Sequence, residues 1–288
     1  MASRERARHT PRMLQLAGID VEAVSIGGVE TCIDLPGFGV AFDLGRGADF
    51  AIARELVCIT HAHVDHLSGI VWHCATRALR GMRPPRYVIG PDDADALRDL
   101  FAVWRRLDRS ELPHELVVLR PGEELALAGG RFVRPFAAPH RSPCQGYAVW
   151  SRRSKLRAEH RALAPEAIAR ARAEGRSDLF ETVEVPEVAF CGDTTIDVVE
   201  REDVVRKARL LILEVTFLDE RVPVEKARAS GHVHLKELAA RAELFENEAL
   251  LLTHFSPRYS REEVLVALER GLPPKLRERA TPLLERRG

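Results

Sequence analysis

The hexapeptide His61-Ala62-His63-Val64-Asp65-His66 directly follows an apolar segment, Leu56–Thr60, whose composition is typical of a β-strand. Two histidines at positions i and i+2 of an extended turn present their imidazoles to the same side. Asp65 and His66 stand where a helix is predicted to begin, so this pair can turn toward a second centre nearby. Imidazole and carboxylate groups are ligands of the kind that select zinc. The hexapeptide therefore predicts a site for two metal ions, and chance produces such a hexamer in only about one chain in a thousand.

Three further candidate ligands follow predicted strands in the same way. They are His140 after Arg131–Phe136, Asp193 after Val188–Cys191, and His254 after Leu250–Thr253. Taken singly, each has a structural alternative: His140 as a loop cap, Asp193 as a turn residue, and His254 as a buried histidine with satisfied hydrogen bonds. Together with the hexapeptide, metal ligation is the better interpretation, because strand ends at one edge of a sheet lead into a shared cleft.

The composition excludes several classes of protein. Of the 288 residues, 30% are charged and 45% are hydrophobic, which is typical of a folded globule rather than a disordered chain. The 43 basic residues balance the 43 acidic ones, which argues against nucleic-acid binding by overall basicity but allows a local basic patch. No apolar run approaches the ~18 residues that a membrane helix needs. The five cysteines form no C-x-x-C pair, which argues against a disulfide framework or a cysteine-based zinc site and favours the cytoplasm.

Short apolar segments typical of strands recur along the chain. The predicted strands are Val21–Ile26, Val40–Asp43, Leu56–Thr60, Arg86–Ile89, Leu116–Leu119, Arg131–Phe136, Tyr147–Trp150, Val188–Cys191, Leu210–Leu213 and Leu250–Thr253. The predicted helices are Ala94–Leu107, Pro165–Glu174, Leu235–Phe245 and Arg261–Glu269. This mixture predicts an α/β or α+β fold, with residues 21–288 as a single domain and residues 1–20 as a flexible N-terminal tail.

A stretch rich in Arg, Ala and Glu interrupts the strand pattern, and we interpret it as an arm inserted into the domain at about residues 151–185. Its first part, Ser151–Arg176, contains eight basic residues and three acidic ones. The most concentrated basic residues are Arg152, Arg153, Lys155 and Arg157. Such side chains make phosphate contacts that give affinity without sequence information, so they are candidates for binding nucleic acid. The alternative for each of them is a solvated charged surface.

The order of the motifs resembles the metallo-β-lactamase fold. It runs from the hexapeptide through His140 and Gly192-Asp193-Thr194 to Thr253-His254-Phe255-Ser256, with Arg258-Tyr259 following. Within that superfamily the chain is similar to ribonuclease Z, a family of tRNA 3′-processing endonucleases, in the short form found in plants. The features that narrow the resemblance are Glu214-Val215-Thr216-Phe217 and Gly231-His232. The resemblance implies an αββα sandwich of two mixed β-sheets flanked by helices.

The resemblance also implies a site with two zinc ions, with manganese or iron as the alternatives. Its ligand assignment is His61, His63 and His140 to one ion, Asp65, His66 and His254 to the other, and Asp193 between the two. Glu214 and His232 match a pair in which the histidine reaches the scissile phosphate and the glutamate orients it.

The sequence departs from the family pattern next to that pair. Leu213 stands where many members have a histidine, and Val233-His234 stands where many bacterial members have Ser-Thr. The hydrogen bonding of Glu214 and His232 is therefore open at this point. We interpret His234 as a helix-entry residue rather than a catalytic one.

The implied activity is hydrolysis of precursor tRNA that removes the 3′ trailer, leaving a tRNA 3′-OH and a trailer 5′-phosphate. Asp65 would align the attacking hydroxide, and His232, held by Glu214, would act as the general acid. The resemblance further implies a homodimer in which the arm of one subunit presents tRNA to the site of the other. The alternatives are a phosphodiesterase for cyclic nucleotides or cyclic phosphates, a thioester or lactone hydrolase, and a metal protein that binds RNA without cutting it.

Overall fold

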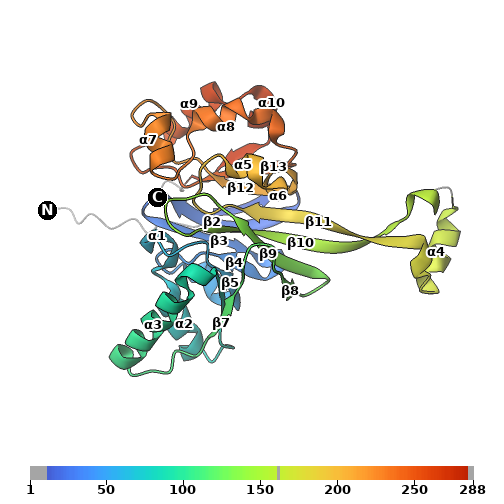
Figure 1. Ribbon diagram of the computed structural model, residues 1–288, viewed down its shortest axis with the longest axis horizontal. Helices are drawn as coiled ribbons and strands as arrows, with labels where there is room; N and C mark the ends of the chain where they lie inside the picture. The colour runs from blue at the N-terminus through green and yellow to red at the C-terminus, as the bar shows by residue number, and fades with distance from the viewer. Residues whose placement is uncertain (1–11, 161–162, 285–288) are drawn as a thin grey trace.

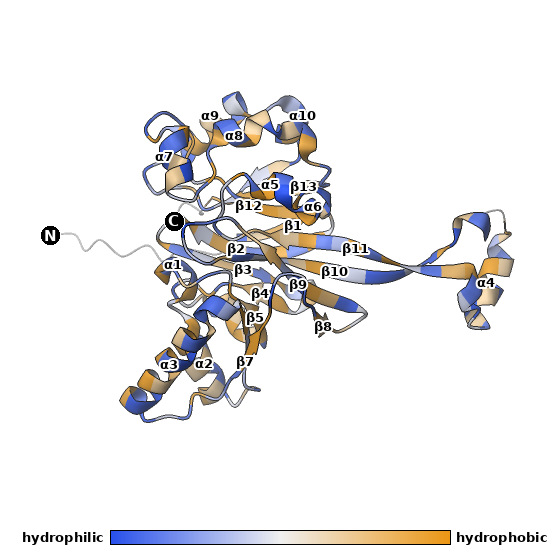
Figure 2. Ribbon diagram, viewed as in Figure 1, coloured by the Kyte–Doolittle hydropathy of each residue, from blue (hydrophilic) through white to orange (hydrophobic). Residues whose placement is uncertain are grey.

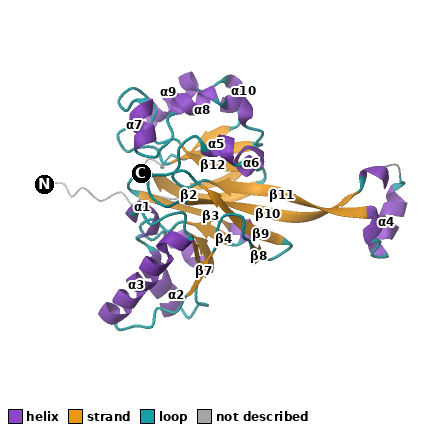
Figure 3. Ribbon diagram, in the orientation of Figure 1, coloured by secondary structure: helices purple, strands orange, loops and turns teal. Residues whose placement is uncertain are grey.

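In the computed structural model, which describes residues 12–160 and 163–284, two seven-stranded sheets pack face to face between layers of helices (Figures 1 and 3). The first sheet consists, in order, of β1 (Arg12–Leu16), β2 (Ile19–Ile26), β3 (Glu30–Leu35), β4 (Val40–Phe42), β5 (Leu56–Cys58), β6 (Arg86–Ile89) and β7 (Glu115–Val118). The second consists of β14 (Ala280–Pro282), β13 (Ala249–Thr253), β12 (Leu210–Glu214), β11 (Phe180–Phe190), β10 (Gln145–Leu156), β9 (Arg131–Ala137) and β8 (Leu125–Leu127).

The helices divide between the outer faces of the two sheets. The helices beside the first sheet are α1 (Val64–Leu67), α2 (Ile70–Leu79) and α3 (Pro91–Asp108). Those beside the second are α5 (Val198–Arg201), α6 (Asp203–Lys207), α7 (Val224–Ala229), α8 (Leu235–Ala240), α9 (Arg261–Gly271) and α10 (Pro274–Arg277). The predicted αββα sandwich is therefore confirmed. Within the described part of the chain, no helix has the length and apolar character needed to cross a membrane.

Both sheets are mixed, and they use the same sequence of pairings. Strands β1 to β4 pair antiparallel and β4 to β7 pair parallel. Strands β8 to β11 likewise pair antiparallel, and β11 to β14 pair parallel. Strand β4 of the first sheet and strand β11 of the second therefore hold equivalent positions, each at the change from antiparallel to parallel pairing.

Alternate side chains of the central strands enter different hydrophobic cores. In β12, Leu210 and Ile212 face the core between the sheets, whereas Leu211 and Leu213 face the helices outside the second sheet. All four are fully buried, which contributes about 1.5–3 kcal/mol for each side chain. Figure 2 shows the hydrophobic residues concentrated on the strands at the centre of the molecule. Strands buried on both faces hold the loops at their ends in fixed positions.

The predicted N-terminal tail, residues 1–20, is wrong in its second part. Arg12–Leu16 form β1, which pairs antiparallel with β2. Leu14 and Leu16 pack against the core between the sheets. Gly18, with a φ of 72°, lies in the turn between the two strands. Residues 1–11, on which the rest of this prediction falls, lie outside the described residues.

The segment interpreted as an inserted arm is a long two-stranded ribbon. Strands β10 and β11 stay paired from Tyr147 opposite Phe190 as far as Leu156 opposite Phe180. Beyond Ser151 the ribbon leaves the body of the molecule, and it carries α4 (Pro165–Ala173) at its far end (Figure 1). The strand prediction stopped at Trp150 because exposed charged residues follow, yet the antiparallel partner continues to supply backbone hydrogen bonds there.

Candidate metal centre

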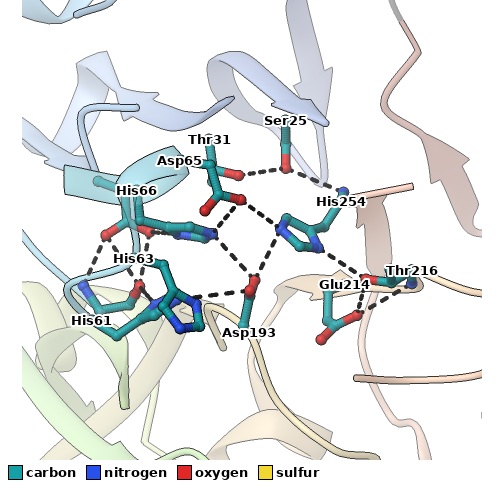
Figure 4. Close-up of polar contacts among 12 residues, drawn as sticks. Ser25, Thr31, His61, His63, Asp65, His66, Asp193, Glu214, Thr216 and His254 are labelled. Atoms are coloured by element: carbon teal, nitrogen blue, oxygen red, sulfur yellow. Dashed lines mark hydrogen bonds and ion pairs between the residues drawn. The ribbon is translucent and has the colours of Figure 1, made fainter. Parts of the chain in front are cut away.

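The predicted ligands meet at one edge of the sandwich, where loops follow strands of both sheets. His61 and His63 lie in the loop after β5, and Asp65 and His66 lie in α1. His140 follows β9, Asp193 follows β11, and His254 follows β13. Figure 4 shows how the labelled members of this set converge around Asp193. The structure thus brings together all seven of the side chains that the sequence analysis proposed as ligands.

These side chains, together with Glu214 and His232, form three overlapping groups, and within each group the nitrogen and oxygen atoms lie within 4.8 Å of one another. One group is His61, His63, His140 and Asp193; a second is Asp65, His66 and His254; a third is Asp193, Glu214, His232 and His254.

Asp193 lies between the first two groups because each of its carboxylate oxygens faces a different one. Its Oδ2 lies 3.7 Å from His61 Nε2, while its Oδ1 lies 3.3 Å from His66 Nε2 and 3.3 Å from His254 Nε2. The residue is almost fully buried.

The Nδ1 atoms of four histidines contact oxygens of the protein, which fixes their rings. The contacts are His66 to Asp43 Oδ2 at 2.7 Å, His140 to the Gly231 carbonyl at 2.8 Å, His254 to Thr216 Oγ1 at 2.9 Å, and His61 to Thr60 Oγ1 at 3.0 Å. With Nδ1 as the donor, each ring is left with its Nε2 lone pair available.

Several buried atoms at the centre have no hydrogen-bonding partner within the described residues. They are Nε2 of His61, His66 and His140 and Oδ1 of Asp193. Unpaired buried polar atoms are rare in folded proteins because each costs free energy. Burial also lowers the pKa of His61 to about 2 and lowers the pKa values of His63 and His140, which keeps these imidazoles neutral. Neutral imidazoles and a carboxylate without partners are donors suited to a divalent metal such as zinc.

Asp65 differs from Asp193 in that its carboxylate accepts a hydrogen bond from a backbone N–H. Its Oδ2 accepts a hydrogen bond from the Gly28 backbone N–H at 2.9 Å and lies 3.4 Å from His254 Nε2. Burial raises the pKa of Asp65, but the contacts with His254 and His66 outweigh burial and hold the pKa below its usual range. Asp65 is therefore an ionised acceptor at neutral pH.

Glu214 and His232 are hydrogen-bonded beside the metal groups, with Glu214 Oε1 2.8 Å from His232 Nδ1. Glu214 also accepts from the backbone N–H groups of Thr194 at 3.0 Å and Val233 at 3.3 Å. Burial acts to lower the pKa of His232, but the carboxylate of Glu214 outweighs it and raises the pKa to about 9. The His232 side chain keeps 16% of its surface exposed, so a substrate can reach it.

The two departures from the family pattern leave this pair intact. Leu213 packs into the outer hydrophobic core, and Val233 packs there too while its backbone N–H bonds to Glu214. His234 caps α8, because its side chain accepts a hydrogen bond from the Lys236 backbone N–H. The interpretation of His234 as a helix-entry residue is therefore confirmed.

Sequence reasoning missed three residues that support the centre: Asp43, Thr60 and Thr216. The Thr60 hydroxyl donates to Asp43 and faces His61 Nδ1, and the Thr216 hydroxyl donates to Glu214 and faces His254 Nδ1. Asp43 also adopts an unusual backbone conformation, with a φ of 55°. Two signals were available: Asp43 ends a predicted strand, and Thr216 belongs to the motif Glu214-Val215-Thr216-Phe217.

The four basic residues of the arm do not reach the centre. Arg152 forms ion pairs with Glu124 at 2.7 Å and Glu184 at 3.1 Å, and Arg153 forms one with Glu187. Lys155 and Arg157 are exposed and have no ion pair within the part of the chain that the structure describes. The five cysteines are free, and none belongs to a metal-binding group among the described residues.

Comparison with known proteins agrees with the fold and the centre. The profile described as "Beta-lactamase superfamily domain" matches residues 52–255, which include all seven proposed ligands. The chain is a hydrolase of the metallo-β-lactamase superfamily. It is 41% identical to tRNase Z TRZ1 of Arabidopsis thaliana over 95% of this chain and 98% of that protein. Within the superfamily it belongs to the tRNase Z family, as the resemblance predicted.

Two further comparisons extend this result. The chain is 36% identical to tRNase Z TRZ2, chloroplastic, of Arabidopsis thaliana, over 97% of this chain and 79% of that protein. The crystal structure of human tRNase Z, short form (ELAC1), superposes with a TM-score of 0.52 at 21% identity, covering 92% of this chain and 90% of that one. At that identity the human structure shows the shared fold alone.

Proposed function

We propose that this protein is a zinc-dependent endoribonuclease that removes the 3′ trailer from precursor tRNA. The observation that carries the proposal is the Glu214–His232 hydrogen bond at 2.8 Å beside histidines whose Nε2 atoms face Asp193. The names of the Arabidopsis relatives, tRNase Z, support the choice of tRNA as the substrate.

Two zinc ions fit the donor set. His61, His63 and His140 would hold one ion, Asp65, His66 and His254 would hold the other, and Asp193 would serve both. Manganese or iron would suit the same ligands. When bound, such ions make water more acidic and offset negative charge on phosphoryl oxygens.

The chain's own residues would orient water and transfer a proton. The Asp65 carboxylate, held by the Gly28 N–H, would accept a hydrogen bond from the attacking water and align it with the phosphorus. His232 would donate a proton to the departing 3′ oxygen, while Glu214 keeps the ring in place. The products would be a tRNA with a 3′-OH and a trailer with a 5′-phosphate.

We further propose a homodimer in which the arm of one subunit holds tRNA at the centre of the other. The centre lies at the end of the second sheet where β10 begins and β11 ends, whereas the arm leaves from the opposite end of both strands. At about 3.3 Å for each residue, the 12 residues of β10 place its outer end at Leu156, where the helical tip of the arm begins, roughly 35 Å from the centre of the same subunit. Arg152, Arg153, Lys155 and Arg157 would contact phosphates from there. The free cysteines support a location in the cytoplasm.

The test is incubation of the zinc-loaded protein with a 3′-extended precursor tRNA, followed by mapping of both new ends. We expect cleavage after the discriminator nucleotide, a 3′-OH on the tRNA and a 5′-phosphate on the trailer. An intact precursor in the presence of fully bound metal would overturn the proposal and favour a phosphodiesterase for cyclic nucleotides or cyclic phosphates. For the dimer, a charge-reversed arm variant and a variant lacking His232 should each be inactive alone and should recover activity when mixed. No recovery of activity in the mixture would exclude cleavage in trans.

A further inference from the structure

Two exposed arginines that the proposed mechanism does not use lie close in the chain to the proposed ligands. Arg141 directly follows His140, and Arg258 lies four residues after His254. Neither has an ion-pair partner among residues 12–160 and 163–284. The carboxylates of Asp193 and Glu214 are buried and lie beside His66 and His232 rather than beside either arginine. Both guanidinium groups therefore keep their charge available to a ligand.

The backbone around Arg141 packs against the residue that precedes His232. The Gly231 carbonyl lies 2.8 Å from His140 Nδ1, and a Cβ at Gly231 would lie 3.0 Å from the Arg141 nitrogen. Burial lowers the pKa of His63 and Asp193 opposes it, while the charge of Arg141 lowers it further. The same charge also acts on His232.

Arg258 reaches the same histidine through an aromatic ring. Its guanidinium carbon lies 5.4 Å from the centre of the Phe217 ring, and Phe217 meets the His232 ring edge-on with the two ring centres 5.9 Å apart. Phe217 is largely buried, so it provides a fixed surface on which the planar guanidinium stacks. Stacking leaves the N–H groups at the edge of the guanidinium free to donate hydrogen bonds.

We propose that Arg141 and Arg258 bind the phosphates that neighbour the scissile phosphate in the RNA, one arginine to each. This inference rests on the proposed function and adds to it the residues that set the register of cleavage. Arginine suits this role because its donor fork matches two oxygens of one phosphate. With both neighbouring phosphates held, only one linkage can face His232.

The test uses the zinc-loaded full chain and a 3′-extended precursor tRNA. The variants are Arg141→Ala, Arg258→Ala and, as a matched control, Arg80→Ala, which removes an exposed arginine at the end of α2. We expect KM to rise about tenfold in each of the first two variants, with zinc content unchanged, because each loses a charged hydrogen-bond donor. The plot of log(kcat/KM) against log salt should become shallower by about 0.7 for each lost contact. Arg141→Lys should restore the slope, since it keeps the charge.

Uncharged methylphosphonate linkages identify the phosphates. Placed next to the cleaved linkage, one such group should weaken wild-type binding as much as the matching arginine variant does, and the two changes together should add nothing. Equal KM values and salt slopes in Arg141→Ala, Arg258→Ala and Arg80→Ala would overturn the inference. If the wild-type protein fails to cleave, the proposed function falls instead. Fluorescence anisotropy with labelled precursor then decides the inference, because equal Kd values across the variants would refute it.

Discussion

Replacing Asp43 by asparagine should weaken metal binding without removing a ligand. Asp43 accepts hydrogen bonds from the Thr60 backbone N–H at 2.8 Å and the Thr60 hydroxyl, and it lies 2.7 Å from His66 Nδ1. Asparagine has one acceptor oxygen. If that oxygen keeps the Thr60 contacts, the amide NH2 faces His66 Nδ1 and favours the tautomer with the proton on Nε2, which cannot bind a metal.

The magnitude follows from the contact that is lost. A hydrogen bond to a charged group contributes about 1.5–3 kcal/mol, and every 1.4 kcal/mol is a factor of ten in Kd. We therefore expect the Kd of the zinc ion held by His66 to rise about 10- to 100-fold, measured by competition with a chromophoric chelator. Asp34→Asn is the matched control, because Asp34 is an equally buried aspartate that contacts Arg54 instead of the centre. Asp43→Asn affinities within threefold of wild type for both zinc ions would refute this reasoning.

Three other changes test separate parts of the molecule. Glu214→Gln should lower kcat about 10²- to 10⁴-fold at unchanged zinc content, because the carboxylate that holds His232 is lost; unaltered single-turnover rates would contradict this. The double variant Lys155→Ala/Arg157→Ala should raise KM for precursor tRNA more than Arg152→Ala/Arg153→Ala does, because Arg152 and Arg153 already form ion pairs with glutamates. Equal KM values in the two double variants would contradict this. Burial lowers the pKa of His73 to about 4, so as the pH falls His73 is protonated in the unfolded chain before it is protonated in the folded one. The free energy of unfolding should therefore drop by about 3 kcal/mol between pH 6.5 and 4 on account of His73, and urea titrations of His73→Gln should lack this part of the drop.

The predicted strands were found because most of them are short apolar runs that end in a polar residue. Strand β3, Glu30–Leu35, was missed because three of its six residues are polar, yet all six are buried. Asp34 is stabilised there by Arg54, and Thr31 by Ser25 at 3.1 Å. These partners lie outside β3, in β2 and in the segment before β5, so the sequence of β3 alone gives no sign of them.

The proposed ligands could be selected from the sequence because they cluster in one hexapeptide or follow strands. Their supporting residues could not be selected. The supporting role of Thr60 and Thr216 is to lie between a histidine and a carboxylate, and only contact distances reveal it. The ion pairs of Arg152 were equally hidden, because Glu124 lies 28 residues away in the sequence.

The equivalence of β4 and β11 has a consequence for how the two sheets are held together. Asp43 follows β4 and Asp193 follows β11, and each sheet carries a chain of contacts from a histidine through a threonine to a carboxylate. Neither half of the molecule has the full ligand set, so bound metal would link the two halves at their interface. The free energy of metal binding would then add to the free energy of unfolding of the whole sandwich. Loss of the metal would lower the stability of the fold as well as stop its chemistry.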